Sequence, residues 1–101
     1  DIHYSIFLQD GEFLGRVSLQ YGRCKYPEIA IVVVKKYQNQ GYGFKLLKEW
    51  CSWVHEVYGY SRVDILIDAE NEPSIRLFRK LDVKWDSKDS DVLECHIELP
   101  L

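Results

Sequence analysis

One segment of the sequence, IAIVVVKKYQNQGYGFKLL from Ile29 to Leu47, constrains the fold more than any other. Its first part is continuously apolar up to Val34, which is typical of a central strand that is covered on both faces. Two glycines follow, Gly41 and Gly43, and from Gly43 onward the apolar residues recur at helical spacing. The segment therefore predicts a buried strand that passes through a glycine-containing turn into a helix.

A helix that begins in this way can hold an anion. Its first turn presents unpaired backbone N–H groups and about half a unit of positive charge, and glycines let a bulky anion come close because they have no Cβ atom. The N–H groups of this cradle would belong to Gln40, Gly41, Tyr42, Gly43 and Phe44. The alternative interpretation is that the two glycines serve only a tight turn between strand and helix, and the residues leave both open.

Two common types of phosphate site are excluded by the residues around the turn. A nucleotide-binding P-loop requires lysine followed by serine or threonine after its last glycine, whereas Phe44 and Lys45 follow Gly43. A dinucleotide-binding fingerprint requires a third glycine, and Leu46 occupies that position.

Apolar periodicity and turn residues predict the remaining elements. Asp10-Gly11 is a hairpin signal, Gly59 is suited to end the first helix, and Asn71 and Pro73 mark the start of the second. We expect strands at residues 2–9, 13–19, 28–34, 62–68, from 83 onward and at 93–99, helices at 43–58 and 71–81, and a polar turn at 86–91. This order predicts a single domain over residues 1–101 of the α/β (α+β) class, with a mixed, mostly antiparallel sheet and flanking helices.

The composition narrows the functional classes. The 101-residue chain is 47% hydrophobic and has a net charge of -3 without a basic block, so nucleic-acid binding is not expected. Its longest apolar run is too short to span a membrane, and no secretory signal is visible. The cysteines and histidines lack the spacing of a disulfide framework or a metal site, which favours reduced thiols, no bound metal and a cytoplasmic location; these residues are Cys24, Cys51, Cys95, His3, His55 and His96.

Three short motifs lie on the predicted central strand and at the starts of the two helices. They are Glu28 at the opening of the strand, Gln38-x-x-Gly41-x-Gly43 at the first helix, and Asn71-x-x-Ser74-x-x-Leu77 followed by Phe78 at the second. In combination they resemble the GNAT superfamily of acetyl-CoA-dependent N-acetyltransferases, over about residues 13 to 99. The signature of that family is Gln or Arg, two residues, Gly, one residue, and then Gly or Ala.

The resemblance implies that the chain binds acetyl-CoA. The pyrophosphate would lie on the N–H groups of residues 40–44, and the pantetheine arm would lie like an added strand between residues 32–34 and residues 67–69. Asn71 would hydrogen-bond the pantetheine, and the second helix would flank the thiol end. The coenzyme-binding residues that the resemblance implies are Val32, Val33, Val34, Gln38, Asn39, Gln40, Gly41, Tyr42, Gly43, Phe44, Asn71, Ser74 and Phe78.

The implied reaction is direct transfer of an acetyl group from acetyl-CoA to a primary amine of an unidentified acceptor, either a small molecule or a protein. Glu28 is the candidate catalytic base, acting directly or through water, and a backbone N–H near Val33 is the candidate oxyanion donor. The alternative role of Glu28 is that of a carboxylate that solvates the end of the strand. A homodimer is left open.

Three departures from the family pattern bear on turnover. Phe78 stands where the family has a tyrosine that protonates the leaving thiolate, and Asp82 stands where it has glycine. The family's usual first strand and two helices, which wall the acceptor site, are not expected in this chain. The alternatives to an enzyme are therefore a non-catalytic acyl-CoA-binding regulatory or protein-interaction module, and a phosphate-ligand domain outside this family.

Overall fold

The structure is a computed structural model that describes residues 1–21, 25–81, 83–88 and 91–101. Along the chain these residues form β1 (Ile2–Phe7), β2 (Phe13–Gln20), β3 (Glu28–Val33), a short 3-10 helix η1 (Lys35–Tyr37), α1 (Tyr42–Tyr58), β4 (Arg62–Asp68), α2 (Glu72–Arg79), β5 (Lys84–Lys88) and β6 (Val92–Glu98).

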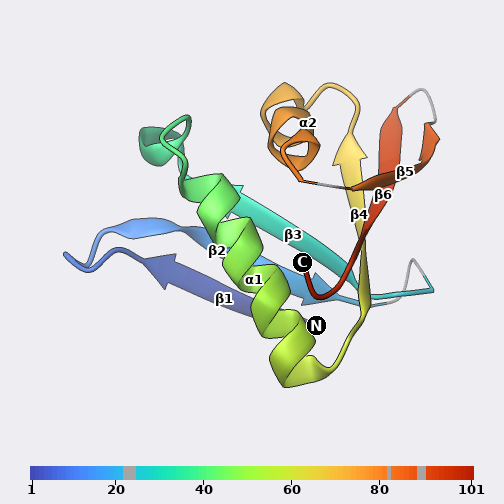
Figure 1. Cartoon of the computed structure of the whole chain (residues 1–101). Coiled ribbons are helices and arrows are strands. Elements are labelled where there is room, and N and C mark those ends of the chain that lie inside the picture. The colour runs from blue at the N-terminus through green and yellow to red at the C-terminus, as the bar shows by residue number, and fades with distance from the viewer. Residues whose placement is uncertain (22–24, 82, 89–90) are drawn as a thin grey trace.

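The six strands form one sheet in the order β1-β2-β3-β4-β6-β5. Neighbouring strands are antiparallel except for the central pair, β3 and β4, which α1 connects as a crossover helix. In Figure 1 these two strands meet at one end and separate toward the other. This mixed, mostly antiparallel sheet with flanking helices confirms the predicted fold class.

The local sequence explains where both helices begin and end. Gly41 and Gly59 flank α1 with φ values of 88° and 76°, a conformation that glycine adopts without a Cβ penalty. The N–H of Gly59 donates to the carbonyl of His55 at 3.0 Å and so closes the helix. At the start of α2, the side chain of Asn71 accepts the N–H of Ser74 at 3.3 Å, as expected of an N-cap.

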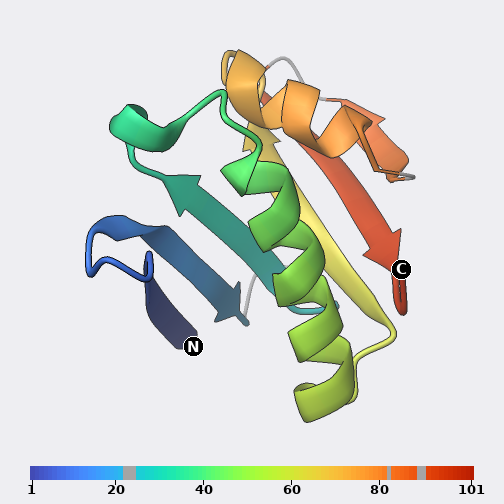
Figure 2. The same cartoon turned by 60° about the vertical axis from the view of Figure 1, so that its left-hand side comes forward.

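The hydrophobic core lies between one face of the sheet and the two helices, which share that side (Figure 2). Leu19, Leu47 and Ile97 are almost completely buried there. Cys51 and Cys95 are buried, free thiols, whereas Cys24 lies outside the described residues. Within the described ranges, no helix is long and apolar enough to cross a membrane.

Three parts of the sequence-based prediction differ from the structure. The prediction that the central strand is covered on both faces is wrong, because the helices cover only one face of the sheet and Ala30 and Val32 of β3 are exposed. The helix η1 was not predicted, and the predicted polar turn at 86–91 is wrong at residues 86–88, which belong to β5. Lys88 pairs with Leu93 at the edge of the sheet, where polar residues are tolerated because one side of the strand faces water. Residues 89–90 of that turn, and Asp82, lie outside the described residues.

Candidate functional site

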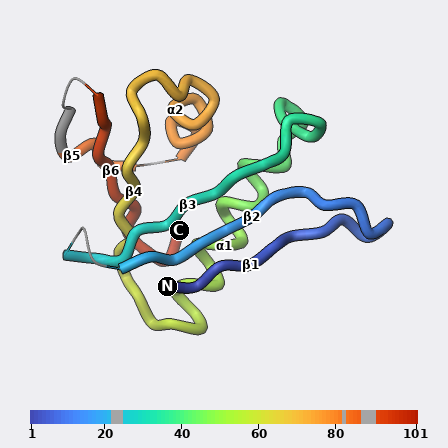
Figure 3. The backbone as a smooth tube through the Cα atoms, turned by 180° about the vertical axis from the view of Figure 1, so that it is seen from behind, coloured from blue at the N-terminus to red at the C-terminus, as the bar shows by residue number. Residues whose placement is uncertain are grey.

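The centre of the sheet is open on one side. Within the described residues, β3 and β4 pair at a single position, Glu28 opposite Asp64, next to a hydrogen bond of 2.8 Å from the Asp64 N–H to the Pro27 carbonyl. Beyond this apex the strands diverge, and the start of α1 and the whole of α2 lie near the open end (Figures 1 and 3). The divergence leaves the inner edges of both strands without a partner strand.

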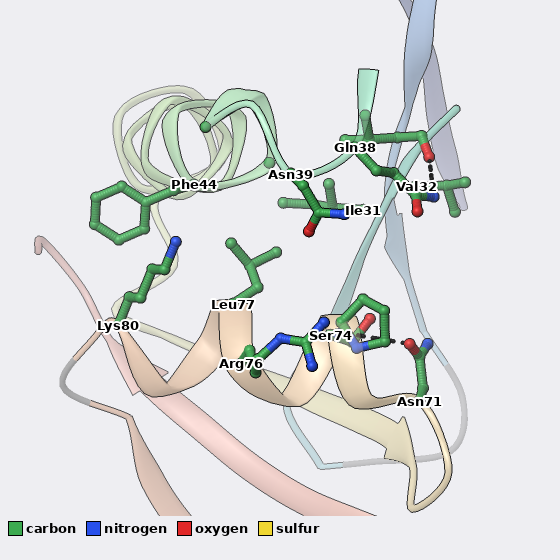
Figure 4. Close-up of a pocket in the computed structure, with 14 residues that line it drawn as sticks. Ile31, Val32, Gln38, Asn39, Phe44, Asn71, Ser74, Arg76, Leu77 and Lys80 are labelled. Carbon is green, nitrogen blue, oxygen red and sulfur yellow. Dashed lines mark hydrogen bonds between the residues drawn. The ribbon is translucent and has the colours of Figure 1, made fainter. Parts of the chain in front are cut away.

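A groove of about 350 Å³ lies at the open end, within the size range of small-molecule sites. One wall comes from β3 and the turn before α1, and the other from α2, as Figure 4 shows. The lining residues are Ile31, Val32, Val33, Gln38, Asn39, Gly41, Gly43, Phe44, Asn71, Pro73, Ser74, Arg76, Leu77 and Lys80.

The start of α1 presents free backbone donors to this groove. Gly41, the residue before the helix, has no side-chain cap, and the first intrahelical hydrogen bond runs from the Lys45 N–H to the Gly41 carbonyl at 3.3 Å. Among the described residues, no group accepts a hydrogen bond from the N–H groups of residues 40–44. These donors and the positive end of the helix dipole form a site that favours an anion.

The turn that leads into α1 is held by its own amide side chains. Gln38 Nε2 donates to the carbonyl of Val33 at 2.9 Å, and Gln40 Nε2 donates to the carbonyl of Lys36 at 3.0 Å. Asn39 between them has a positive φ of 62°, which asparagine tolerates better than most residues. The signature glutamine therefore fixes the end of β3 against the glycine turn.

The α2 wall adds positive charge to the groove. Arg76 and Lys80 are exposed and line it, and the ring of Phe44 lies between two ammonium groups. Lys48 Nζ is 5.5 Å and Lys80 Nζ is 6.0 Å from the ring centroid. Figure 4 shows Phe44 and Lys80 facing each other across one end of the groove. This end of the groove therefore combines an aromatic face with cationic groups, which suits an aromatic ligand group that has phosphate groups attached.

Most of the residues proposed from the sequence as coenzyme ligands line this one groove. They are Val32, Val33, Gln38, Asn39, Gly41, Gly43, Phe44, Asn71 and Ser74.

Four others lie beside the groove. The N–H of Val34 donates to the Leu14 carbonyl at 2.9 Å, and the Gln40 side chain turns back to η1. The Tyr42 ring packs edge-on against Tyr37. Phe78 is a core residue with 5% exposure. Glu28 is buried at the apex of the divergent strands.

Sequence reasoning missed five lining residues. Four of them, Pro73, Arg76, Leu77 and Lys80, follow the spacing i, i+3, i+4, i+7 and so share one face of α2. The fifth, Ile31, precedes Val33 by two residues and lies on the same face of β3. This periodicity is a signal that sequence alone provides.

Comparison with protein families assigns the chain. The family model described as the acetyltransferase (GNAT) domain matches residues 1–84. The chain belongs to the GNAT acetyltransferase family. This confirms the resemblance drawn from Gln38, Gly41 and Gly43.

Solved structures agree with the GNAT fold. An acetyltransferase of the GNAT family from Bacillus anthracis superimposes with a TM-score of 0.83 at 18% identity, over 95% of this chain and 65% of that one. Spermidine N-acetyltransferase from Vibrio cholerae in complex with CoA and spermine gives 0.81 at 13%, over 95% and 64%. A GNAT acetyltransferase from Streptococcus pneumoniae gives 0.76 at 20%, over 91% and 64%.

The chain thus spans a little less than two thirds of the length of these structures. No curated protein sequence matched it. At these identities the superpositions establish the fold.

Proposed function

We propose that the chain is an N-acetyltransferase that moves the acetyl group of acetyl-CoA to a primary amine. The observation that carries this proposal is the set of free N–H groups of residues 40–44, which open onto a groove between the end of β3 and α2, at the open end of the diverging strands. Free N–H groups at a helix start bind the oxygens of a diphosphate, and unpaired strand edges can hydrogen-bond an amide-containing arm.

The parts of acetyl-CoA are proposed to lie along the groove in order. The pyrophosphate is proposed to lie on the N–H groups at the start of α1, and the nucleotide end beside Phe44 and Lys80. The pantetheine would lie between residues 32–34 and residues 67–69 as an added strand. Asn71 uses its side-chain oxygen to cap α2, which leaves its NH₂ group to donate to the pantetheine.

The end of β3 supports the proposed oxyanion contact. The N–H of Val34 points to β2, where it donates to Leu14. Because successive N–H groups of a strand point to opposite edges, the N–H of Val33 points toward the gap. There it is proposed to stabilise the oxyanion that forms when the amine attacks the thioester carbonyl.

Glu28 is the proposed catalytic base. It opens β3 at the apex of the divergent strands and is 7% exposed. An ammonium group must lose a proton before its nitrogen can attack, and a carboxylate at the apex can accept that proton directly or through a water molecule. Phe78 has no hydroxyl group to protonate the leaving thiolate, so water is proposed to supply that proton.

The proposed acceptor is a cationic amine, either a small molecule or a protein side chain. A protein of the same fold binds spermine together with CoA, and the net charge of -3 is compatible with a cationic substrate.

Two measurements test the proposal. Titration calorimetry should show binding of acetyl-CoA but not of ATP or NAD. Release of free CoA thiol should rise when spermidine, spermine or a lysine peptide is added, and Glu28→Gln should lower kcat by about 100-fold or more. The matched control is Glu56→Gln, an exposed carboxylate on α1 outside the groove.

The second candidate function is a non-catalytic acyl-CoA-binding module, which the buried Phe78 favours. If acetyl-CoA binds but none of the amines raises thiol release above hydrolysis, this second function replaces the first. If ATP or NAD binds as tightly as acetyl-CoA, both functions are wrong.

A further inference from the structure

A row of ionisable residues crosses the face of the sheet that the helices leave open. Sheet register places Glu28 on β3 opposite Asp64 on β4, and Asp64 opposite His96 on β6. Directly paired residues project from the same face of a sheet. Neighbouring strands lie about 4.8 Å apart, so the backbones of Glu28 and His96 are about 10 Å apart across the apex.

His96 is the least expected member of this row. It is only 9% exposed, and its Nδ1 atom lies 2.7 Å from both carboxylate oxygens of Asp86. The register of β5 against β6 shifts between Trp85 and Ser87, so Asp86 is the additional residue of a β-bulge. Bulges re-aim side chains and are frequent next to active sites. Here the bulge residue holds the imidazole ring.

Two of the carboxylates near His96, those of Asp64 and Asp86, are engaged by Arg62. Arg62 Nε bonds Asp64 at 3.0 Å, a terminal nitrogen of Arg62 lies 4.0 Å from Asp86, and the guanidinium lies 4.3 Å from the centre of the Tyr26 ring. The contacts with Arg62 hold both carboxylates in place, so Asp86 is positioned to orient the ring of His96.

Among the described residues, the other ring nitrogen of His96 has no hydrogen-bond partner. In the described part of the chain, every buried side-chain nitrogen and oxygen atom has a hydrogen-bond partner, and none of the interactions of His96 involves Nε2. Because Asp86 accepts a hydrogen bond from Nδ1–H, Nε2 of the neutral ring carries the lone pair.

We propose that His96 is a second base of the acetyl transfer: Glu28 takes the first proton of the acceptor ammonium, and His96 takes the second at Nε2 after the nitrogen has attacked, with Asp86 as the positioning residue of the ring. This inference rests on the proposed function. One N–H bond of the ammonium breaks, its proton passes to Glu28, and its electron pair remains on the nitrogen and forms the bond to the thioester carbonyl carbon. A second N–H bond on the same nitrogen then breaks and its proton passes to Nε2, while the C–S bond breaks and water protonates the thiolate. The Glu28 carboxyl and the imidazolium return their two protons, one to the hydroxide left by that water and one to solvent.

The charges around the ring set the pH dependence of this step. Asp86 and Lys84 face it from β5, Asp64 and Arg62 from β4, and Glu94 and Glu98 belong to its own strand, β6. Imidazole is the side chain that ordinarily changes charge between pH 5 and 8. Because a base that accepts a proton is needed in its unprotonated form, removal of the imidazole should change the acidic limb of the kcat/KM profile.

The test compares His96→Gln with His3→Gln in the full chain. His3 is an exposed histidine on β1 and is the matched control. With acetyl-CoA and the best acceptor among spermidine, spermine and a lysine peptide, His96→Gln should lower kcat/KM by about 100-fold and change the acidic limb, whereas His3→Gln should do neither. Asp86→Asn, which keeps the imidazole, should lower kcat/KM by about tenfold and shift the same limb. KM for acetyl-CoA should stay unchanged in both.

The outcomes separate this inference from the proposed function. If calorimetry shows no binding of acetyl-CoA, the proposed function fails and this inference with it. If acetyl transfer occurs but His96→Gln retains kcat/KM within threefold of His3→Gln and the same acidic limb, only the inference is overturned. If acetyl-CoA binds and no amine is acetylated, the inference is overturned as well. Should His96→Gln fail to fold in a urea titration, the pH profile of Asp86→Asn decides.

Discussion

Gly43 lines the groove next to Leu77 and Val33, so the size of the side chain at this position determines how wide the groove is there. A Cβ atom there would lie 3.5 Å from Leu77 and 3.8 Å from Val33, which is ordinary contact. We expect Gly43→Ala to raise the free energy of unfolding by up to about 1 kcal/mol, because alanine favours a helix, and to bind acetyl-CoA nearly as well as the native chain. The branched side chain of Gly43→Val should instead weaken binding about tenfold or more.

Urea unfolding and titration calorimetry measure these two effects separately. Native affinity in Gly43→Val would show that the coenzyme does not pass between α1 and α2.

Phe78 occupies the position of the family tyrosine but serves the core. Its side chain is 5% exposed and belongs to the buried cluster with Ile75. We expect Phe78→Tyr to lower the free energy of unfolding by about 1–3 kcal/mol, because the added hydroxyl group enters an apolar site, and to leave kcat unchanged. Urea titration and thiol-release kinetics test this. A clear rise in kcat would place position 78 beside the thiol.

Single positions were predictable from the sequence only where one residue type suffices for a role. Gly41 and Asn71 were predicted at helix starts, and the structure has them there, because a left-handed turn and an N-cap are local requirements. The burial of Phe78 depends on how α2 packs on the sheet, and the pairing of His96 with Asp86 depends on a β-bulge. Neither is encoded in local spacing.

At the level of elements, Gly15 sets how closely β2 approaches β3. A Cβ atom at this position would lie 2.0 Å from the carbonyl oxygen of Val32, and backbone atoms cannot move away without breaking the pairing of the strands. We expect Gly15→Ala to lower the free energy of unfolding by about 3 kcal/mol or more, and to weaken coenzyme binding because β3 forms a wall of the groove.

Gly11→Ala is the matched control for this change. Gly11 has open space around it but a φ of 90°, so alanine should cost only about 1–2 kcal/mol. Urea unfolding compares the two variants. An equal loss in both would mean that the contact with Val32 does not limit the sheet.

Elements with strong periodicity or caps were predictable, and elements defined by pairing were not. β4 and α1 were predicted to within a residue because their apolar spacing and the glycine after α1 are local signals. The start of β5 was predicted, whereas its residues 86–88 are polar in sequence and belong to the strand because β5 pairs with β6. The divergence of β3 from β4 likewise depends on the whole sheet. It was predicted from the family resemblance and not from the residues themselves.

At the level of the whole molecule, alkaline pH should destabilise the fold. Burial raises the pKa of the Cys51 and Cys95 thiols from 9.0 to about 12, and the hydrogen bond with Tyr60 raises the pKa of Tyr21 from 10.0 to about 12. These groups are neutral when protonated, and folding favours that form. Their contribution to stability is complete below about pH 9 and is lost as the pH rises toward 12.

The midpoint of urea unfolding should therefore fall steadily from pH 9 to 11. Tyr21→Phe should fall less steeply above pH 10, and a thiol reagent at pH 8 should modify Cys51 and Cys95 only after denaturant is added. A constant midpoint across this pH range would contradict the burial of the two thiols.

Over the residues that the structure describes, β3 and β4 pair at only one position. The sheet therefore consists of two blocks, β1-β2-β3 and β4-β6-β5, that are joined at that position. Anything that lies along both inner edges stiffens the molecule, since it fixes the angle between the blocks. When such a ligand binds, hydrogen exchange of the amide protons along the inner edges of β3 and β4 should therefore slow on both strands together, and not on one strand before the other. A ligand bound along both edges would then act as part of the sheet for as long as it stays bound.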